Sequence, residues 1–145
     1  MANIQMENAL IFHGKPPRGR YEDPTVPKPH EANWLPRVAN ELTERGIPTQ
    51  IPAFPQPYSP NWGIYKEYLK PYTINESTGI AAHSAGTEVG LRLMSENPTL
   101  RLSVLALVAP YKDREGKYGD FSKYTLDPNL AKRVGKIVII NSFDD

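Results

Sequence analysis

The pentapeptide Ala82-His83-Ser84-Ala85-Gly86 constrains the fold of this chain more than any other segment. It follows the apolar run 79–82 and precedes a helix-like segment over residues 87–95. The pattern is one residue away from G-x-S-x-G, in which a serine occupies a tight strand-to-helix turn with its hydroxyl exposed. Small residues at positions 82 and 86 suit such a turn, because strand and helix backbones approach closely there. Ser84 is therefore the candidate nucleophile; the competing interpretation is an ordinary serine at a helix N-cap.

Apolar runs and helical patterns alternate along the rest of the chain. Runs typical of strands cover residues 9–12, 47–54, 79–82, 102–109 and 136–140, with prolines weakening the second. Patterns typical of helices cover residues 34–45, 62–70, 87–95 and 128–134, with Asn33 as the expected N-cap of the first. This alternation predicts an α/β fold: a three-layer sandwich with a mostly parallel sheet and helices on both faces.

Proline is concentrated in the first half of the chain. Eleven of the fifteen prolines lie between Pro16 and Pro60, and five of them fall between Lys15 and His30. We expect residues 15–31 to form a long proline-rich loop beside the end of the first strand, where it would act as a lid. A solvated connector is the alternative interpretation.

Candidate site residues follow the strands, and sites in parallel α/β sheets form where the strands end. His13-Gly14 follows the first strand and Ser84 the third. The backbone N–H groups of Ala85 and Lys15 are the expected oxyanion-hole donors, because Pro16 and Pro17 have no N–H to offer. A turn glycine beside a structural His13 is the alternative for the first-strand end.

An acid follows the last expected strand, but no histidine follows that acid. Asp144 and Asp145 stand where a triad acid would orient a histidine, although a solvated turn would show the same pair. Tyr111 and Phe143 are candidate pocket-lining residues or simple packing residues. The three histidines, at positions 13, 30 and 83, all precede the acid, whereas this kind of site needs the order Ser, Asp, His. We expect His83 to be structural.

Composition excludes several classes of partner and cofactor. Lys and Arg number 17 against 16 Asp and Glu, so no basic surface predicts nucleic-acid binding. The chain has no cysteine, no signal-peptide pattern at its start and no apolar run long enough to cross a bilayer. We expect a cytoplasmic protein without a membrane partner. No metal-ligand cluster or phosphate-binding glycine motif is present, so we expect no cofactor; a flavodoxin-like nucleotide binder is the weaker alternative.

Several blocks, taken in order, resemble a known family. They are Ile11-Phe12-His13-Gly14, Ile51-Pro52-Ala53-Phe54-Pro55, the Ser84 pentapeptide, Leu107-Val108-Ala109-Pro110-Tyr111 and Ser142-Phe143-Asp144-Asp145. The chain resembles the small single-domain serine hydrolases of the α/β-hydrolase fold that include retinoblastoma-binding protein 9 and the bacterial YdeN-like proteins. The resemblance spans nearly the whole chain and implies that Ser84 is the nucleophile and Asp145 the triad acid.

The family pattern continues beyond this acid with a helix, a strand, the loop of the catalytic histidine and a closing helix. The resemblance therefore implies that residues 1–145 form a single α/β-hydrolase-like domain, incomplete at the C-terminus and lacking the last strand and helix. The expected function is hydrolysis of carboxylic esters or small amides through an acyl-enzyme on Ser84, with the 145-residue chain inactive alone. The alternative is a non-catalytic module on the same scaffold that binds a protein partner.

Overall fold

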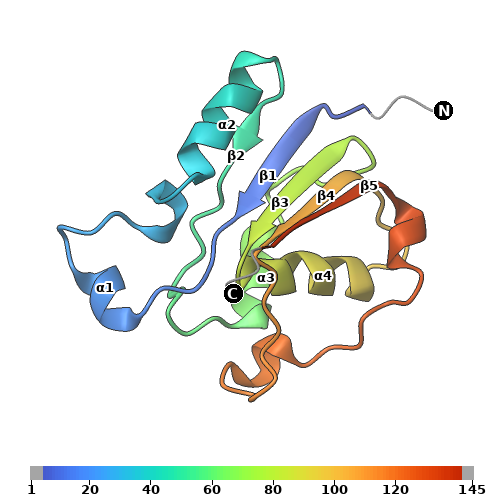
Figure 1. Ribbon diagram of the computed structural model, residues 1–145. Coiled ribbons are helices and arrows are strands. Elements are labelled where there is room, and N and C mark those ends of the chain that lie inside the picture. Colours follow the sequence, from blue (N-terminus) through green and yellow to red (C-terminus); the bar gives the residue numbers. More distant parts are fainter. Residues whose placement is uncertain (1–4, 142–145) are drawn as a thin grey trace.

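The computed structural model describes residues 5–141 and is built on one five-stranded sheet (Figure 1). All neighbouring strands are parallel, in the order β2-β1-β3-β4-β5. The strands are β1 (Asn8–Phe12), β2 (Thr49–Gln50), β3 (Thr78–His83), β4 (Leu102–Val108) and β5 (Val134–Ile140). The expected parallel α/β architecture is confirmed. Flavodoxin-like proteins share this strand order, so the order alone does not indicate which function the protein has.

Helices cover both faces of the sheet, which confirms the three layers. On one face lie α3 (Trp62–Leu69) and α4 (Gly86–Glu96), and on the other lies α2 (Leu35–Glu44). The larger core includes Leu10, Phe12, Ile80, Val89, Met94 and Leu105, and the smaller one Ile11, Leu35 and Ala39. Each large apolar side chain buried in this way contributes about 1.5–3 kcal/mol. No helix within residues 5–141 has the length and apolar character needed to cross a membrane.

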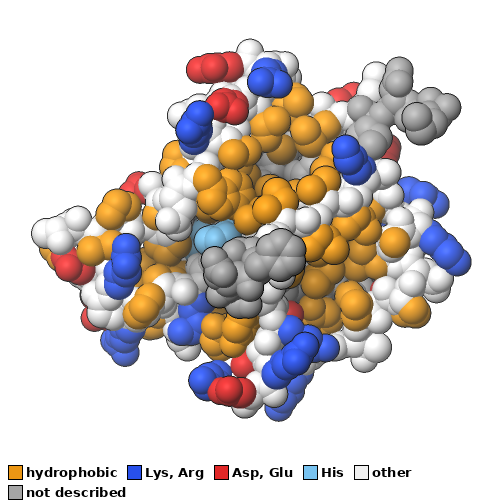
Figure 2. Space-filling view, viewed as in Figure 1, with side chains coloured by type: hydrophobic (Ala, Val, Ile, Leu, Met, Phe, Trp, Pro, Cys, Tyr) orange, Lys and Arg blue, Asp and Glu red, His pale blue; other side chains and the backbone are white. Residues whose placement is uncertain are grey.

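The sheet is least covered at β5, its edge strand. Ile139 and Ile140 are 64% and 54% exposed, whereas Leu105 on the neighbouring strand is fully buried. Figure 2 shows hydrophobic side chains gathered over this part of the sheet. An apolar edge strand of this kind exposes unpaired backbone groups that natural sheets usually protect.

Prolines shorten the second strand. The apolar pattern predicts a strand over residues 47–54, but only Thr49–Gln50 pairs with β1. Pro48 and Pro52 flank this pair, and a proline has no N–H to donate to a sheet. The segment after β2 therefore leaves the sheet and leads towards α3.

Two other predictions are corrected. The segment 128–134 forms only the 3₁₀ turn η3 (Leu130–Arg133), and β5 begins directly after it. Asn33 does not cap α2: the N-cap is Trp34, which makes no side-chain capping bond, and Asn33 has a left-handed φ of 59°. The loop over residues 15–31 is also more ordered than expected, because it contains α1 (Arg18–Glu22) and the 3₁₀ turn η1 (Pro29–Glu31).

Candidate active site

Ser84 lies on the sharp turn between β3 and α4. Its φ of 53° falls in the left-handed region, which costs a residue with a Cβ roughly 1–2 kcal/mol. Its N–H donates to the Val108 carbonyl at 2.9 Å, and its own carbonyl accepts from the Thr87 N–H at 2.9 Å. The N-cap of α4 is Ala85, without a side-chain capping bond, so the Ser84 hydroxyl does not serve as a helix cap. Strain held in place by surrounding hydrogen bonds is typical of functional turns.

Two glycines allow the end of β1 to approach this turn. A Cβ on Gly86 would lie 2.6 Å from the Phe12 carbonyl oxygen and 2.7 Å from that of His13. Only glycine fits there, so the start of α4 packs directly on the end of β1. A Cβ on Gly14 would lie 3.2 Å from the Ser84 Cβ and 3.7 Å from its Oγ. The loop after β1 therefore runs past the candidate nucleophile.

His13 holds that loop in place. Its side chain is 4% exposed, and its Nε2 accepts a hydrogen bond from the Phe54 N–H at 3.1 Å. Nδ1 must then carry the proton, which it donates to the Gly14 carbonyl at 2.8 Å. Burial lowers the pKa of His13 to about 4, so the ring is neutral at physiological pH. Both nitrogens are engaged, which makes His13 a structural residue that fixes Gly14 beside Ser84.

The two expected oxyanion donors belong to one small cavity. Ala85 and Lys15 both line a space of about 10 Å³, together with Gly14 and Val89. A cavity of roughly 10–15 Å³ is the size that accommodates one water-sized group. Within residues 5–141, neither the Ala85 N–H nor the Lys15 N–H is recorded with a hydrogen-bond acceptor. Two residues whose backbone N–H groups have no acceptor in the described part of the chain thus line a space that fits one oxygen atom.

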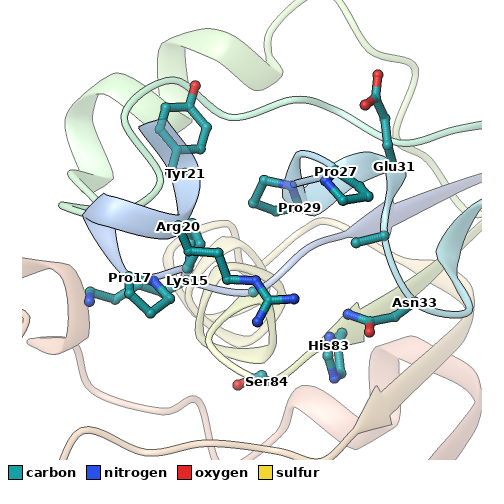
Figure 3. A pocket seen from close by; sticks show the side chains of 13 residues that line it. Lys15, Pro17, Arg20, Tyr21, Pro27, Pro29, Glu31, Asn33, His83 and Ser84 are labelled. Carbon is teal, nitrogen blue, oxygen red and sulfur yellow. The ribbon is translucent and has the colours of Figure 1, made fainter. Parts of the chain in front are cut away.

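A larger cavity of about 490 Å³ opens beside Ser84 (Figure 3). Ser84 and His83 line it on the sheet side, and residues of the 15–31 loop form the opposite wall. The loop is anchored to the turn before α3, because the Tyr21 ring lies 5.4 Å from the Tyr58 ring. Lys28 holds it further by donating to the Tyr21 carbonyl and by lying 4.5 Å from the centre of the Tyr21 ring. The proline-rich loop is therefore a formed wall of the cavity.

His83 packs as a structural side chain. Its ring meets the Trp34 ring edge to face at 5.7 Å, and burial lowers its pKa. Figure 3 shows the Ser84 hydroxyl directed away from the His83 ring. Across residues 5–141, no hydrogen bond joins Ser84 Oγ to a histidine nitrogen. The described part of the chain therefore presents no histidine poised to take the Ser84 proton.

Of the remaining candidate residues, only Tyr111 lies within residues 5–141. The Tyr111 ring stacks on Tyr118 at 5.4 Å, and its N–H donates to Thr87 Oγ1 at 3.2 Å. Tyr111 is not among the residues that line the 490 Å³ cavity. Asp145 and Phe143 lie outside the described residues, so their roles as triad acid and pocket residue stay predictions.

Sequence reasoning missed the buried polar residues of α4. Thr87 is fully buried and links the turn to the loop after β4, because its Oγ1 donates to the Ser84 carbonyl at 2.6 Å and accepts from Tyr111. Glu88 is 2% exposed and accepts from the Tyr124 hydroxyl at 3.3 Å, while its Oε2 has no partner among the described residues. Burial raises the pKa of Glu88. In the sequence, both residues belong to the predicted helix over 87–95, and nothing in its pattern indicates that these polar side chains are buried.

Comparison with known proteins places the fold but not the family. A scan against models of protein families and a search of curated proteins each find no match. Among solved structures, the chain is similar to the ydeN gene product from B. subtilis, with a TM-score of 0.72 and 23% sequence identity. The match covers 97% of this chain and 73% of that protein. At this level of identity the likeness shows a YdeN-like α/β fold, and the chemistry must be argued from the site itself.

Proposed function

We propose that this chain is a member of the α/β-hydrolase superfamily and carries the nucleophile of a serine hydrolase. The substrates would be carboxylic esters or small amides, cleaved through an acyl-enzyme on Ser84. The observation that supports this most is the left-handed Ser84 on the β3–α4 turn, followed directly by Ala85, which lines a small cavity together with Lys15. An ordinary N-cap serine needs neither feature.

In the proposed reaction, Ser84 Oγ attacks the substrate carbonyl carbon and its proton passes to a base. The carbonyl oxygen becomes an oxyanion, and the Ala85 and Lys15 N–H groups stabilise it in the small cavity. The tetrahedral intermediate collapses, the C–O or C–N bond breaks, and the leaving alcohol or amine takes the proton. Water then attacks the acyl group in the same way and restores the Ser84 hydroxyl.

The base is the part of this mechanism that residues 5–141 do not supply. His13 uses both ring nitrogens in the fold, and His83 makes no hydrogen bond to Ser84. The proposal therefore assigns proton transfer to a group outside the described residues, oriented by Asp145. Loss of a triad base typically costs several powers of ten in rate, leaving only the contribution of the oxyanion hole and binding.

A fluorophosphonate probe, with and without added imidazole, tests the proposal in the 145-residue chain. Imidazole can accept the proton that no described histidine accepts, so it should accelerate labelling of the wild type. Ser84→Ala should abolish this labelling, whereas Ser59→Ala should not change it, because Ser59 is an exposed serine in an ordinary turn. Labelling that survives in Ser84→Ala contradicts the assignment of the nucleophile.

The second candidate function is a non-catalytic module that binds a protein partner on the same scaffold. The observation that favours it is the absence, among the described residues, of a histidine bonded to Ser84. A cooperatively folded chain whose Ser84 stays unlabelled in the presence of imidazole would favour this alternative over the hydrolase.

A further inference from the structure

Three charged residues line the cavity beside Ser84, and two of them are engaged elsewhere. The Lys15 ammonium lies 5.3 Å from the centre of the Tyr118 ring. The Glu31 carboxylate lies 3.5 Å from the His30 ring, and Figure 3 shows it pointing away from the cavity. Arg20 has no ion pair or hydrogen bond recorded among the described residues. Of these three charged groups, only the Arg20 guanidinium makes no ion pair, hydrogen bond or ring contact within the described part of the chain.

The Arg20 side chain is aimed at the site. Figure 3 shows its guanidinium extending across the cavity towards Ser84, with Asn33 and His83 on the other side. The next residue, Tyr21, is fixed by its contacts with Tyr58 and Lys28, so the helix that carries Arg20 is held in place. Arg20 is solvent-exposed, so its guanidinium is accessible to an anionic ligand that enters the cavity.

Arg18 on the same helix shows the contrast. It forms an ion pair with Glu22 at 2.8 Å, and its guanidinium lies 5.1 Å from the centre of the Tyr58 ring. It does not line the cavity. Arg18 and Arg20 are both exposed, but only Arg18 has an ion pair among the described residues and only Arg20 lines the cavity beside Ser84.

We propose that the cavity selects esters that carry a carboxylate, which the Arg20 guanidinium binds while Ser84 faces the ester carbonyl. The planar guanidinium matches a carboxylate with two parallel hydrogen bonds. Asn33, which also lines the cavity, supplies a further polar contact from the opposite wall. A volume of about 490 Å³ lies within the range of roughly 300–1,000 Å³ found for small-molecule sites. This inference rests on the proposed role of Ser84 as nucleophile.

The carboxylate could belong to the acyl side or the alcohol side of the ester, and two isomeric probes distinguish these. Monomethyl glutarate carries it on the acyl side, and the acetyl ester of γ-hydroxybutyrate carries it on the alcohol side. Dimethyl glutarate is a neutral control. Binding of each probe to the 145-residue chain is measured by NMR titration, following backbone amide shifts around Ser84 and Arg20, so no turnover is needed.

At least one anionic isomer should bind more tightly than the neutral diester. Arg20→Met should weaken that binding by roughly twofold to fivefold, as expected for an exposed charge pair. Arg20→Lys should keep part of the preference for the anionic ester, because lysine retains the positive charge but lacks the two parallel N–H donors of the guanidinium. Arg18→Met is the matched control and should bind the probe as the wild type does.

The outcome separates this inference from the proposed function. If Ser84 reacts with the fluorophosphonate but neither anionic isomer shows a preference that depends on Arg20, the charge selection is wrong and the hydrolase proposal stands. If Arg20 binds the carboxylate but Ser84 is unreactive with imidazole present, the anion site stands and the nucleophile is wrong. Equal weakening by Arg18→Met and Arg20→Met would overturn the inference, since it would indicate a general charge effect.

Discussion

Acidification from about pH 7 to about pH 4 should destabilise the fold through His13. The ring is buried, and burial lowers its pKa from 6.5 to about 4. Between these values the unfolded chain binds a proton at His13 and the folded chain does not, so stability falls as the pH falls. His13 makes its full contribution to the free energy of unfolding above the pKa of the unfolded state. That contribution is lost as the pH falls towards the pKa of the folded state. A difference of about 2.5 pKa units corresponds to about 3 kcal/mol of unfolding free energy.

Urea denaturation of the wild type and His13→Gln across this pH range isolates the effect. Glutamine carries an amide that does not titrate, so the contributions of His83 and of the carboxylates cancel in the difference between the two proteins. The wild type should be more stable at neutral pH, and the gap should shrink by about 3 kcal/mol towards pH 4. An NMR titration of the His13 ring gives the folded pKa directly. A gap that stays constant with pH, or a ring that titrates near 6.5, would refute the reasoning.

Three other predictions test the turn and its surroundings. Ser84→Gly should be more stable than Ser84→Ala by about 1 kcal/mol in urea denaturation, because the left-handed φ penalises a Cβ; equal stability would deny the strain. Gly86→Ala should cost about 1–3 kcal/mol and slow phosphonate labelling, since its Cβ meets the Phe12 carbonyl, whereas Gly90→Ala should be tolerated. Glu88→Gln should gain stability over the wild type as the pH rises above about 4.5, because burial raises the pKa of Glu88 and ionisation of the folded state is penalised; thermal melts that show no pH dependence of the gap would contradict this.

Alternation of apolar runs with helical patterns was sufficient to predict the parallel sheet. Residues 102–109 are almost entirely apolar because β4 is central, with β3 on one side and β5 on the other. The helix over 62–70 begins where Asn61 can cap it, and the structure shows its side chain accepting from the Ile64 N–H. Central strands and capped helices can be predicted from the sequence, because the local residue preferences and the pattern of burial favour the same structure there.

Edges and loops were predicted less well, since contacts distant in sequence decide them. The helix α1 lies in a proline-rich segment where periodicity indicates nothing, and it is held by the contact of Tyr21 with Tyr58. The second strand shrank to two residues because its prolines remove hydrogen-bond donors.

The nucleophile position could be predicted because small residues and a strand-to-helix transition meet at Ser84. The contacts made by the residues around Ser84 could not be predicted. The tautomer of His13 depends on the Phe54 N–H, which lies 41 residues further along the chain. Arg20 faces the cavity only because of the way α1 is anchored, and no motif marks it.

The acyl-enzyme itself offers the most direct test of the central claim, that Ser84 is the nucleophile once a base is supplied. The 145-residue chain is incubated with para-nitrophenyl acetate and 2,6-lutidine, a hindered base that accepts a proton but does not take up the acetyl group; it is then quenched in acid, digested and mapped by mass spectrometry. The account predicts one acetyl group, carried by the peptide that contains Ser84, and none in Ser84→Ala. Acetyl groups spread over lysines and other serines, with Ser84 unmodified, would contradict it.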